Sequence, residues 1–209
     1  MNIDFFNFPN LGVLKSKLTD DELAPIWDEV TRIEQDFSLA TPHNDKLVGN
    51  IKREFKLADS QMHLNNLIIN RVAEYDKKYD FVASNWILTK DLPLMVIDPW
   101  VNFMAKHEFN PPHNHTGMLS FVIWLKIPYN IETERKFSPG ANSLQPMAGT
   151  FSFHYTNILG KLNSWIIPAD NTYENTMLLF PSELSHSVAP FYTSDEYRIS
   201  IAGNLRFQV

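Results

Sequence analysis

The sequence predicts a mainly β fold, an antiparallel sandwich or barrel with two helices packed on the outside of one sheet. In the first third of the 209-residue chain, apolar residues recur at helical spacing. From about residue 80 they fall instead in short runs rich in β-branched and aromatic side chains. Proline and glycine punctuate these runs, which is typical of antiparallel all-β folds. We find no repeat and no linker, and expect one domain over residues 1–209, helical over 1–80 and β-rich over 81–209.

Two helices are predicted in the helical part, each from a start signal and an apolar stripe. The first begins at a capping box formed by Thr19 and Glu22. The second begins after Asp59 or Ser60 and ends near Lys77–Lys78, where cations suit the helix dipole. The stripes comprise Leu23, Ile26, Trp27, Val30, Ile33 and Phe37 in the first helix, and Leu64, Leu67, Ile68, Val72 and Tyr75 in the second.

Eight segments of the β-rich part are predicted as strands, because β-branched and aromatic residues dominate them. The strands are expected over 81–89, 94–104, 118–127, 149–154, 163–167, 176–180, 187–189 and 197–207. Between the third and fourth lies the polar segment 129–145, which has no clear period. A loop of this length is either a lid over a site or a solvated surface loop.

Composition excludes several classes of protein. The net charge of -6 argues against binding of the nucleic-acid backbone, which needs clustered lysine and arginine. No apolar run approaches the roughly 18 residues of a membrane span, so we expect no membrane partner. The first ten residues lack the basic start of a secretory signal, which favours the cytoplasm, or the host cytoplasm for a phage protein. The chain has no cysteine, and thus no disulfide, thiolate ligand or cysteine nucleophile.

The informative histidines are His113, His115 and His186. Residues two apart in an extended segment point to the same face, so His113 and His115 can offer two imidazoles to one ion. His186 follows a later apolar strand. With no cysteine in the chain, a transition-metal site must use imidazole and carboxylate. A histidine pair of this spacing is, however, more often a pair of loop residues bonded to backbone.

The last predicted strand offers an anion-binding pair. Arg198 and Ser200 share one strand face, whereas Ile199 and Ile201 take the other and pack against the core. A guanidinium forks onto a carboxylate with two hydrogen bonds, and a serine two residues away can donate a third. The alternative is an arginine on a solvent-exposed strand face.

Three sequence motifs follow one another along the chain in an order that is typical of a known protein family. They are Pro-x-His-x-His ending at His115, Leu-Phe-Pro-Ser-x-x-x-His-Ser-Val around His186, and Arg-x-Ser from Arg198. Together they resemble the iron(II)- and 2-oxoglutarate-dependent oxygenases, in particular a subgroup of bacterial and phage proteins. The resemblance is strongest from Trp100 to Asn204, and implies a double-stranded β-helix, which is a jelly-roll barrel, with iron near its open end.

The resemblance also implies site residues. Iron(II) would be held by His113 and His186, with His115 in the position where the family has a carboxylate. Arg198 and Ser200 would hold the far carboxylate of the cosubstrate 2-oxoglutarate, and we expect Asn102 to face it. In a second interpretation His115 is the first ligand, and Gly117 leaves the carboxylate position to a halide. Glu108 and Glu183 are weaker candidates for a carboxylate ligand.

The expected activity is that of a dioxygenase. It would use iron(II), 2-oxoglutarate and O2 to hydroxylate a small-molecule or peptide substrate, with release of succinate and CO2. His113, His115 and His186 would be both metal ligands and catalytic residues. One alternative is a cupin-type dioxygenase or isomerase without 2-oxoglutarate, although residues 116–122 lack the glutamate ligand usual there, and Arg198 would have no task. Another is a non-enzymatic jelly-roll that binds a ligand or builds a structure.

Overall fold

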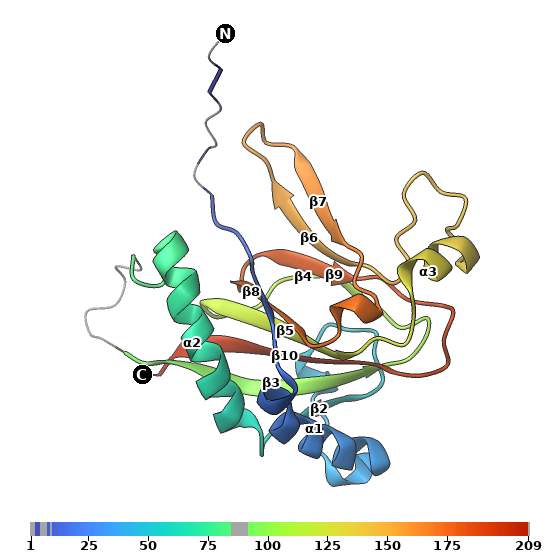
Figure 1. Cartoon of the computed structure of the whole chain (residues 1–209), viewed down its shortest axis with the longest axis horizontal. Coiled ribbons are helices and arrows are strands. Elements are labelled where there is room, and N and C mark those ends of the chain that lie inside the picture. Colours follow the sequence, from blue (N-terminus) through green and yellow to red (C-terminus); the bar gives the residue numbers. More distant parts are fainter. Residues whose placement is uncertain (1–2, 5–7, 9, 85–91, 209) are drawn as a thin grey trace.

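The strands of the protein form two antiparallel sheets (Figure 1). The structure is a computed structural model, and it describes residues 3–4, 8, 10–84 and 92–208. One sheet has the strand order β1-β8-β5-β10-β3-β2 and the other has the order β4-β9-β6-β7. The strands are β1 (Leu14–Lys17), β2 (Glu54–Lys56), β3 (Leu94–Met104), β4 (Asn110–His113), β5 (Leu119–Lys126), β6 (Phe151–Thr156), β7 (Leu162–Ile167), β8 (Thr176–Pro181), β9 (Ser185–Val188) and β10 (Arg198–Phe207).

Two long helices, α1 (Asp20–Gln35) and α2 (Gln61–Tyr79), cover the outer face of the six-stranded sheet (Figure 1). The predicted capping box is confirmed at the start of α1, where the Glu22 backbone N–H donates to the Thr19 hydroxyl and Glu22 accepts from the Thr19 N–H. Ser60 occupies the cap position of α2 but makes no side-chain cap hydrogen bond. None of the described helices is both long and apolar enough to cross a membrane.

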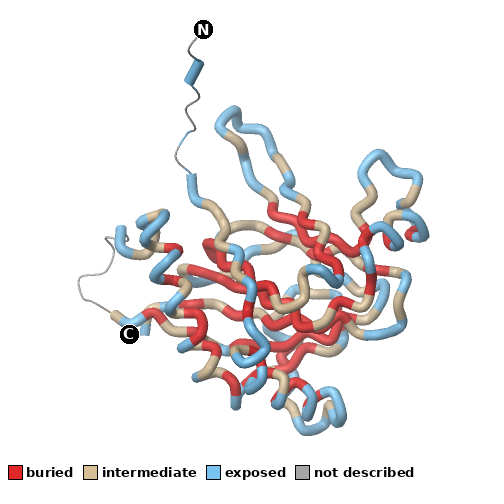
Figure 2. The backbone as a smooth tube through the Cα atoms, in the orientation of Figure 1, coloured by how far each residue is buried: buried red, intermediate tan, exposed pale blue. Residues whose placement is uncertain are grey.

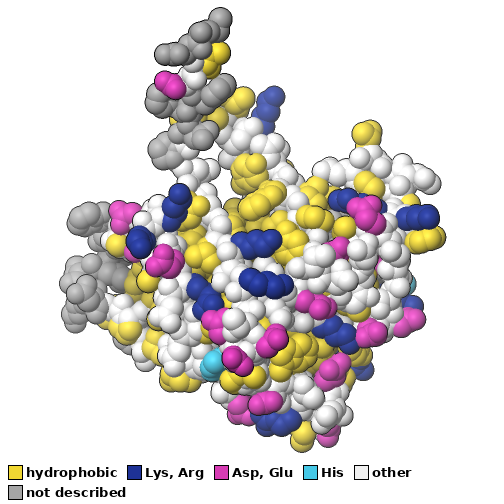
Figure 3. Space-filling view, viewed as in Figure 1, with side chains coloured by type: hydrophobic (Ala, Val, Ile, Leu, Met, Phe, Trp, Pro, Cys, Tyr) yellow, Lys and Arg dark blue, Asp and Glu magenta, His cyan; other side chains and the backbone are white. Residues whose placement is uncertain are grey.

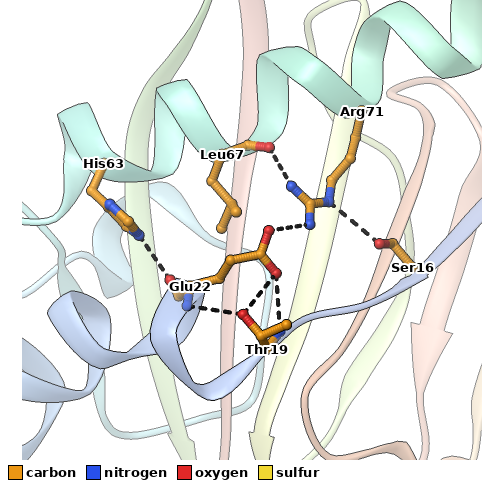
Figure 4. Close-up of polar contacts among 6 residues, drawn as sticks. All are labelled: Ser16, Thr19, Glu22, His63, Leu67 and Arg71. Atoms are coloured by element: carbon orange, nitrogen blue, oxygen red, sulfur yellow. Dashed lines mark hydrogen bonds and ion pairs between the residues drawn. The ribbon is translucent and has the colours of Figure 1, made fainter.

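Glu22 also ties the two helices together (Figure 4). Its carboxylate accepts from Arg71 Nη2 of α2 at 2.6 Å, and its backbone carbonyl accepts from His63 Nε2 of the same helix at 2.7 Å. The hydrogen bond from the Thr19 backbone and the Arg71 guanidinium hold the pKa of Glu22 below its usual value. This contact fixes the start of α1 against α2.

The buried apolar side chains of the described residues form two cores, one on each side of the six-stranded sheet. Figure 2 shows that burial is concentrated along the strands. Along β5 the side chains alternate: Phe121 and Ile123 pack toward the helices, whereas Val122 and Trp124 pack between the sheets. A strand that is buried on both faces has an almost continuous apolar sequence, and β5 has such a sequence. Two facing antiparallel sheets with helices outside one of them form the double-stranded β-helix, or jelly-roll, that was expected.

The structure corrects several element predictions. Phe81 to Ser84 of the predicted strand 81–89 form a turn, and residues 85–89 lie outside the described residues. The polar segment 129–145 is not wholly a loop, because it contains the short helix α3 (Ile131–Phe137). The strands β1, β2 and β4 were not predicted as strands, since each has only three or four residues.

On the face seen in Figure 3, acidic and basic side chains are interspersed, and apolar side chains gather near the hairpin β6–β7. The hairpin and the segment 10–13 border a cavity of about 640 Å³ with an aromatic lining that includes Phe153, Tyr155 and Trp165. The three candidate histidines are not among the described residues that line it. The site therefore lies elsewhere in the fold.

Candidate metal and cosubstrate site

Three histidine side chains converge at the edge of the four-stranded sheet. His113 of β4 and His186 of β9 are directly paired across the two antiparallel strands. Their ring centroids are 4.3 Å apart, and the ring of His115 lies 4.9 Å from His113 and 5.0 Å from His186. One ring nitrogen from each histidine can be chosen so that all three lie within 4.8 Å of one another. One ion between them could bind all three rings.

Backbone carbonyls fix the orientation of two of these rings. His113 Nδ1 lies 2.7 Å from the carbonyl oxygen of Pro111, and His186 Nδ1 lies 3.0 Å from that of Leu184. A carbonyl can only accept a hydrogen bond, so each Nδ1 carries the proton. Each Nε2 is then left with its lone pair, which is the arrangement that a metal-ligating histidine needs.

Burial keeps the rings neutral. Together with a smaller contribution from the neighbouring His113, it lowers the pKa of His186 to about 3 and that of His115 to about 4. The pKa of His113 is also lowered by burial. Three neutral imidazoles offer lone pairs at neutral pH, and imidazole suits iron(II). The site thus fits a divalent transition metal.

Aromatic side chains pack around His186. The ring of Phe151 stacks on it at 5.6 Å with an angle of 19° between the planes, and Phe180 meets it edge-on at 5.1 Å. His186 is 5% exposed as a result. This apolar shell fixes the imidazole and keeps water from one side of the site.

Arg198 is a buried cation that has no acidic partner among the described residues. It is 2% exposed, and no carboxylate of the described residues forms an ion pair with it. Its Nη1 donates to the Tyr129 hydroxyl at 3.2 Å, while its Nε is buried and has no hydrogen-bond partner among the described residues. Burial raises the pKa of Tyr129, so the phenol stays neutral and cannot balance the charge. A buried charge without a counter-charge is costly, and this arrangement fits an anionic ligand.

A ring contact followed by hydrogen bonds connects His115 with Ser200. The indole of Trp100 lies edge-on to the ring of His115 at 5.8 Å, and its Nε1 donates to Asn102 Oδ1 at 3.2 Å. Asn102 Nδ2 in turn lies 3.4 Å from both the hydroxyl and the carbonyl of Ser200. Asn102 and Ser200 are directly paired residues of β3 and β10, and both are buried.

The other candidate ligands lie away from the histidines. A methyl group built on Gly117 would come within 2.8 Å of the carbonyl oxygen of Leu205, so the side-chain position of Gly117 faces β10. The carboxylate of Glu108 accepts from the backbone N–H groups of Lys52 and Ala105, and Glu183 is exposed. The described cluster therefore consists of three imidazoles.

Sequence reasoning missed two residues near these sites. Tyr129, the partner of Arg198, opens the polar segment and carries no local signal of its role. Glu54, on the three-residue strand β2, is 1% exposed and borders a cavity that His113 and His115 also line. A charged residue in so short a segment looks like a surface acid until the sheet order is known.

Comparisons with known proteins agree with this geometry. The family model described as "Putative 2OG-Fe(II) oxygenase" matches residues 98–204. A prolyl-4-hydroxylase from Pseudomonas putida is similar in structure, with a TM-score of 0.53 and 15% identity over 95% of this chain and 94% of that one. The non-heme alpha ketoglutarate dependent epimerase SnoN from nogalamycin biosynthesis has a TM-score of 0.54 and 14% identity over 94% and 78%.

AviO1 from Streptomyces viridochromogenes Tue57 is a further structural neighbour, with a TM-score of 0.52 and 10% identity over 95% of this chain and 91% of that one. At such low identity, the three structures show a shared fold. No curated protein matches the sequence. The family match covers all three histidines, Arg198 and Ser200. The chain belongs to the 2OG-Fe(II) oxygenase family and is an oxygenase.

Proposed function

We propose that the protein hydroxylates an organic substrate, using iron(II), 2-oxoglutarate and O2, and releases succinate and CO2. The observation that carries the proposal is the pairing of two features in one barrel. One is a cluster of three neutral imidazoles, and the other is a buried guanidinium that pairs with no anion in the described part of the chain. The first feature suits a metal and the second suits a dicarboxylic acid.

His113, His115 and His186 would hold the metal through ring nitrogens. The carbonyls of Pro111 and Leu184 keep the Nδ1 protons of His113 and His186 in place, so both rings would bind through Nε2. Where the family has one carboxylate, this site would have His115, and the metal would keep one more unit of positive charge. We expect this to increase the attraction between the metal and an anionic cosubstrate.

Arg198 and Ser200 would bind the far carboxylate of 2-oxoglutarate. They project from the same face of β10, while Ile199 and Ile201 pack on the helix side. The free Nε of Arg198 supplies one donor and the Ser200 hydroxyl supplies another. The Tyr129 hydroxyl donates its proton to the Gly149 carbonyl at 2.9 Å, so its oxygen is free to accept from Arg198 Nη1. This hydrogen bond holds the guanidinium in place.

Bound iron(II) would supply activation of O2, coupled to conversion of 2-oxoglutarate into succinate and CO2. The contribution of the chain is positioning and exclusion of water. The rings of Phe151 and Phe180 shield His186, and the hydrogen bonds of Asn102 order Trp100 beside His115. Rigid placement of this kind lets a substrate group be held beside the metal.

The test is anaerobic addition of iron(II) and 2-oxoglutarate to the purified protein. We expect a visible charge-transfer band, and succinate after admission of air. His186→Ala should abolish both. His154→Ala is the matched control, since the imidazole of His154 binds the hydroxyls of Ser164 and Ser187. If the wild-type protein gives neither band nor succinate, the proposal is wrong. If instead the protein has a metal-dependent activity that needs no 2-oxoglutarate and is retained in Arg198→Ala, the cupin alternative is correct.

A further inference from the structure

A small cavity opens beside two of the three histidines. Its volume is about 80 Å³, and its lining includes Glu54, Trp100, Asn110, His113 and His115. Arg198 and Ser200 are not among the described residues that line it. The cavity therefore reaches the metal cluster from a side other than that of the guanidinium, where a substrate could approach.

Two residues that line this cavity, Glu54 and Asn110, carry side-chain oxygen atoms that can accept hydrogen bonds. Asn110 Oδ1 is buried and has no hydrogen-bond partner among the described residues. Asn44 Nδ2 donates to Glu54 Oε2 at 3.1 Å, and no group of the described chain donates to Glu54 Oε1. A methyl group built on Gly49 would lie 2.1 Å from Asn110 Oδ1 and 3.2 Å from Glu54 Oε1. Gly49 therefore packs directly against Asn110 Oδ1 and close to Glu54 Oε1, and a side chain at this position would displace both groups.

The charge of Glu54 is not balanced within the described protein. The side chain is 1% exposed and forms no ion pair with a described cation. Lys46 borders the cavity, but its ammonium is largely exposed and pairs with Asp45. Burial and the nearby carboxylate of Glu108 raise the pKa of Glu54 to about 7. Glu54 Oε1 and Asn110 Oδ1 have no donor among the described residues, and a positively charged donor would satisfy the carboxylate and the amide oxygen.

We propose that this cavity binds a cationic nitrogen group of the substrate, a guanidinium or a primary ammonium, and holds it beside the metal cluster. The inference rests on the proposed function and names the chemical class of its substrate, a basic amine or guanidine compound. The size agrees, because a water molecule occupies about 30 Å³ in the liquid, so roughly 80 Å³ admits a group of a few heavy atoms. Glu54 and Asn110 are specificity residues in this proposal.

The experiment follows binding of guanidinium, with urea as the neutral probe of similar shape. The readout is the indole N–H resonance of Trp100 in 15N-labelled metal-free protein, assigned by its loss in Trp100→Phe. Millimolar guanidinium should shift the resonance to saturation, and urea should not. Glu54→Gln keeps the shape and removes the charge, and Gly49→Ala forces a methyl group against both oxygens and displaces them. Each should weaken guanidinium binding at least about tenfold, which corresponds to 1.4 kcal/mol.

Glu183→Gln is the matched control, because it removes the same charge from an exposed residue that lines the larger cavity instead. It should bind guanidinium as the wild type does. The inference is overturned if no shift occurs, if urea binds as well as guanidinium, or if Glu54→Gln and Gly49→Ala both bind like the wild type. The charge-transfer band with iron(II) and 2-oxoglutarate is measured on the same proteins. A band without guanidinium binding refutes only the inference; binding without a band refutes the oxygenase chemistry.

Discussion

His113 and His186 face each other as paired residues of the antiparallel strands β4 and β9, with their ring centroids 4.3 Å apart. The register of the two strands therefore sets the separation of the two rings. A shift by one residue would turn one ring to the opposite face of the sheet. The β4–β9 pairing is thus as important for the proposed metal site as the histidines themselves.

Removal of one imidazole should weaken metal binding strongly. We expect His186→Ala to lower iron(II) affinity by more than the roughly 10- to 100-fold that loss of an outer hydrogen-bond partner costs. Replacement His115→Asp should retain binding, because a carboxylate is also a ligand of iron(II). Calorimetric titration under anaerobic conditions measures both. Equal affinity of wild type and His186→Ala would show that this cluster does not hold the metal.

Replacement of the guanidinium should act on 2-oxoglutarate and leave the metal in place. We expect Arg198→Met to raise the Kd for 2-oxoglutarate by about 30-fold or more, since a charged hydrogen-bonded pair contributes about 2–5 kcal/mol. Arg198→Lys should recover part of this, because it restores the charge without the forked donor geometry. Iron(II) affinity, titrated in parallel, should be unchanged; a 2-oxoglutarate Kd that does not respond would contradict the assignment.

The Tyr129 hydroxyl should matter through Arg198. Tyr129→Phe removes the acceptor of Arg198 Nη1 and the donor to the Gly149 carbonyl. We expect a loss of about 1–2 kcal/mol in the free energy of unfolding, since a buried carbonyl is left unpaired. We also expect a several-fold rise in the Kd for 2-oxoglutarate at unchanged metal affinity. Denaturant unfolding and cosubstrate titration provide the two readouts, and a variant with wild-type values in both would exclude this positioning role.

Stability of the metal-free protein should fall as the pH falls from about 6.5 toward 4. The pKa values of His115 and His186 in the folded protein are about 4 and 3, below the value of about 6.5 for an unfolded chain. Between these values the unfolded chain binds more protons, so acid favours unfolding by about 2 kcal/mol or more. His115→Asn should have a shallower dependence in denaturant unfolding at several pH values.

Glu54 should oppose this effect in the same pH range. Its pKa of about 7 lies above the value of about 4.3 for an unfolded chain, so the folded protein binds the extra proton and gains stability as the pH falls through 7. Glu54→Gln should therefore make the acid destabilisation steeper, by about 2 kcal/mol between pH 7 and 4.5. An unchanged slope would mean that Glu54 is ionised in the folded state at these pH values.

Periodic segments could be predicted from the sequence, and long-range pairings could not. The bounds of β3 agree with the prediction, and α1 and α2 begin after the expected cap positions, because apolar period and caps are local signals. The seven-residue helix α3 was missed because so short a segment shows no stripe. The motifs singled out His113, His186 and Arg198, but the contact of Tyr129 with Arg198 joins residues 69 positions apart and depends on the tertiary fold.

The double-sided burial of β10 has a consequence for shortening the protein. Ile199 and Ile201 lie against the helical layer, while their neighbours Arg198 and Ser200 point between the sheets. Without residues 1–80, Ile199 and Ile201 would be exposed to water. The strand would then be less rigid, and the guanidinium of Arg198 would be held less precisely. The N-terminal third thus supports the strand that carries Arg198 and Ser200. An engineered minimal enzyme would have to retain this third or replace it with another apolar surface that packs on the sheet.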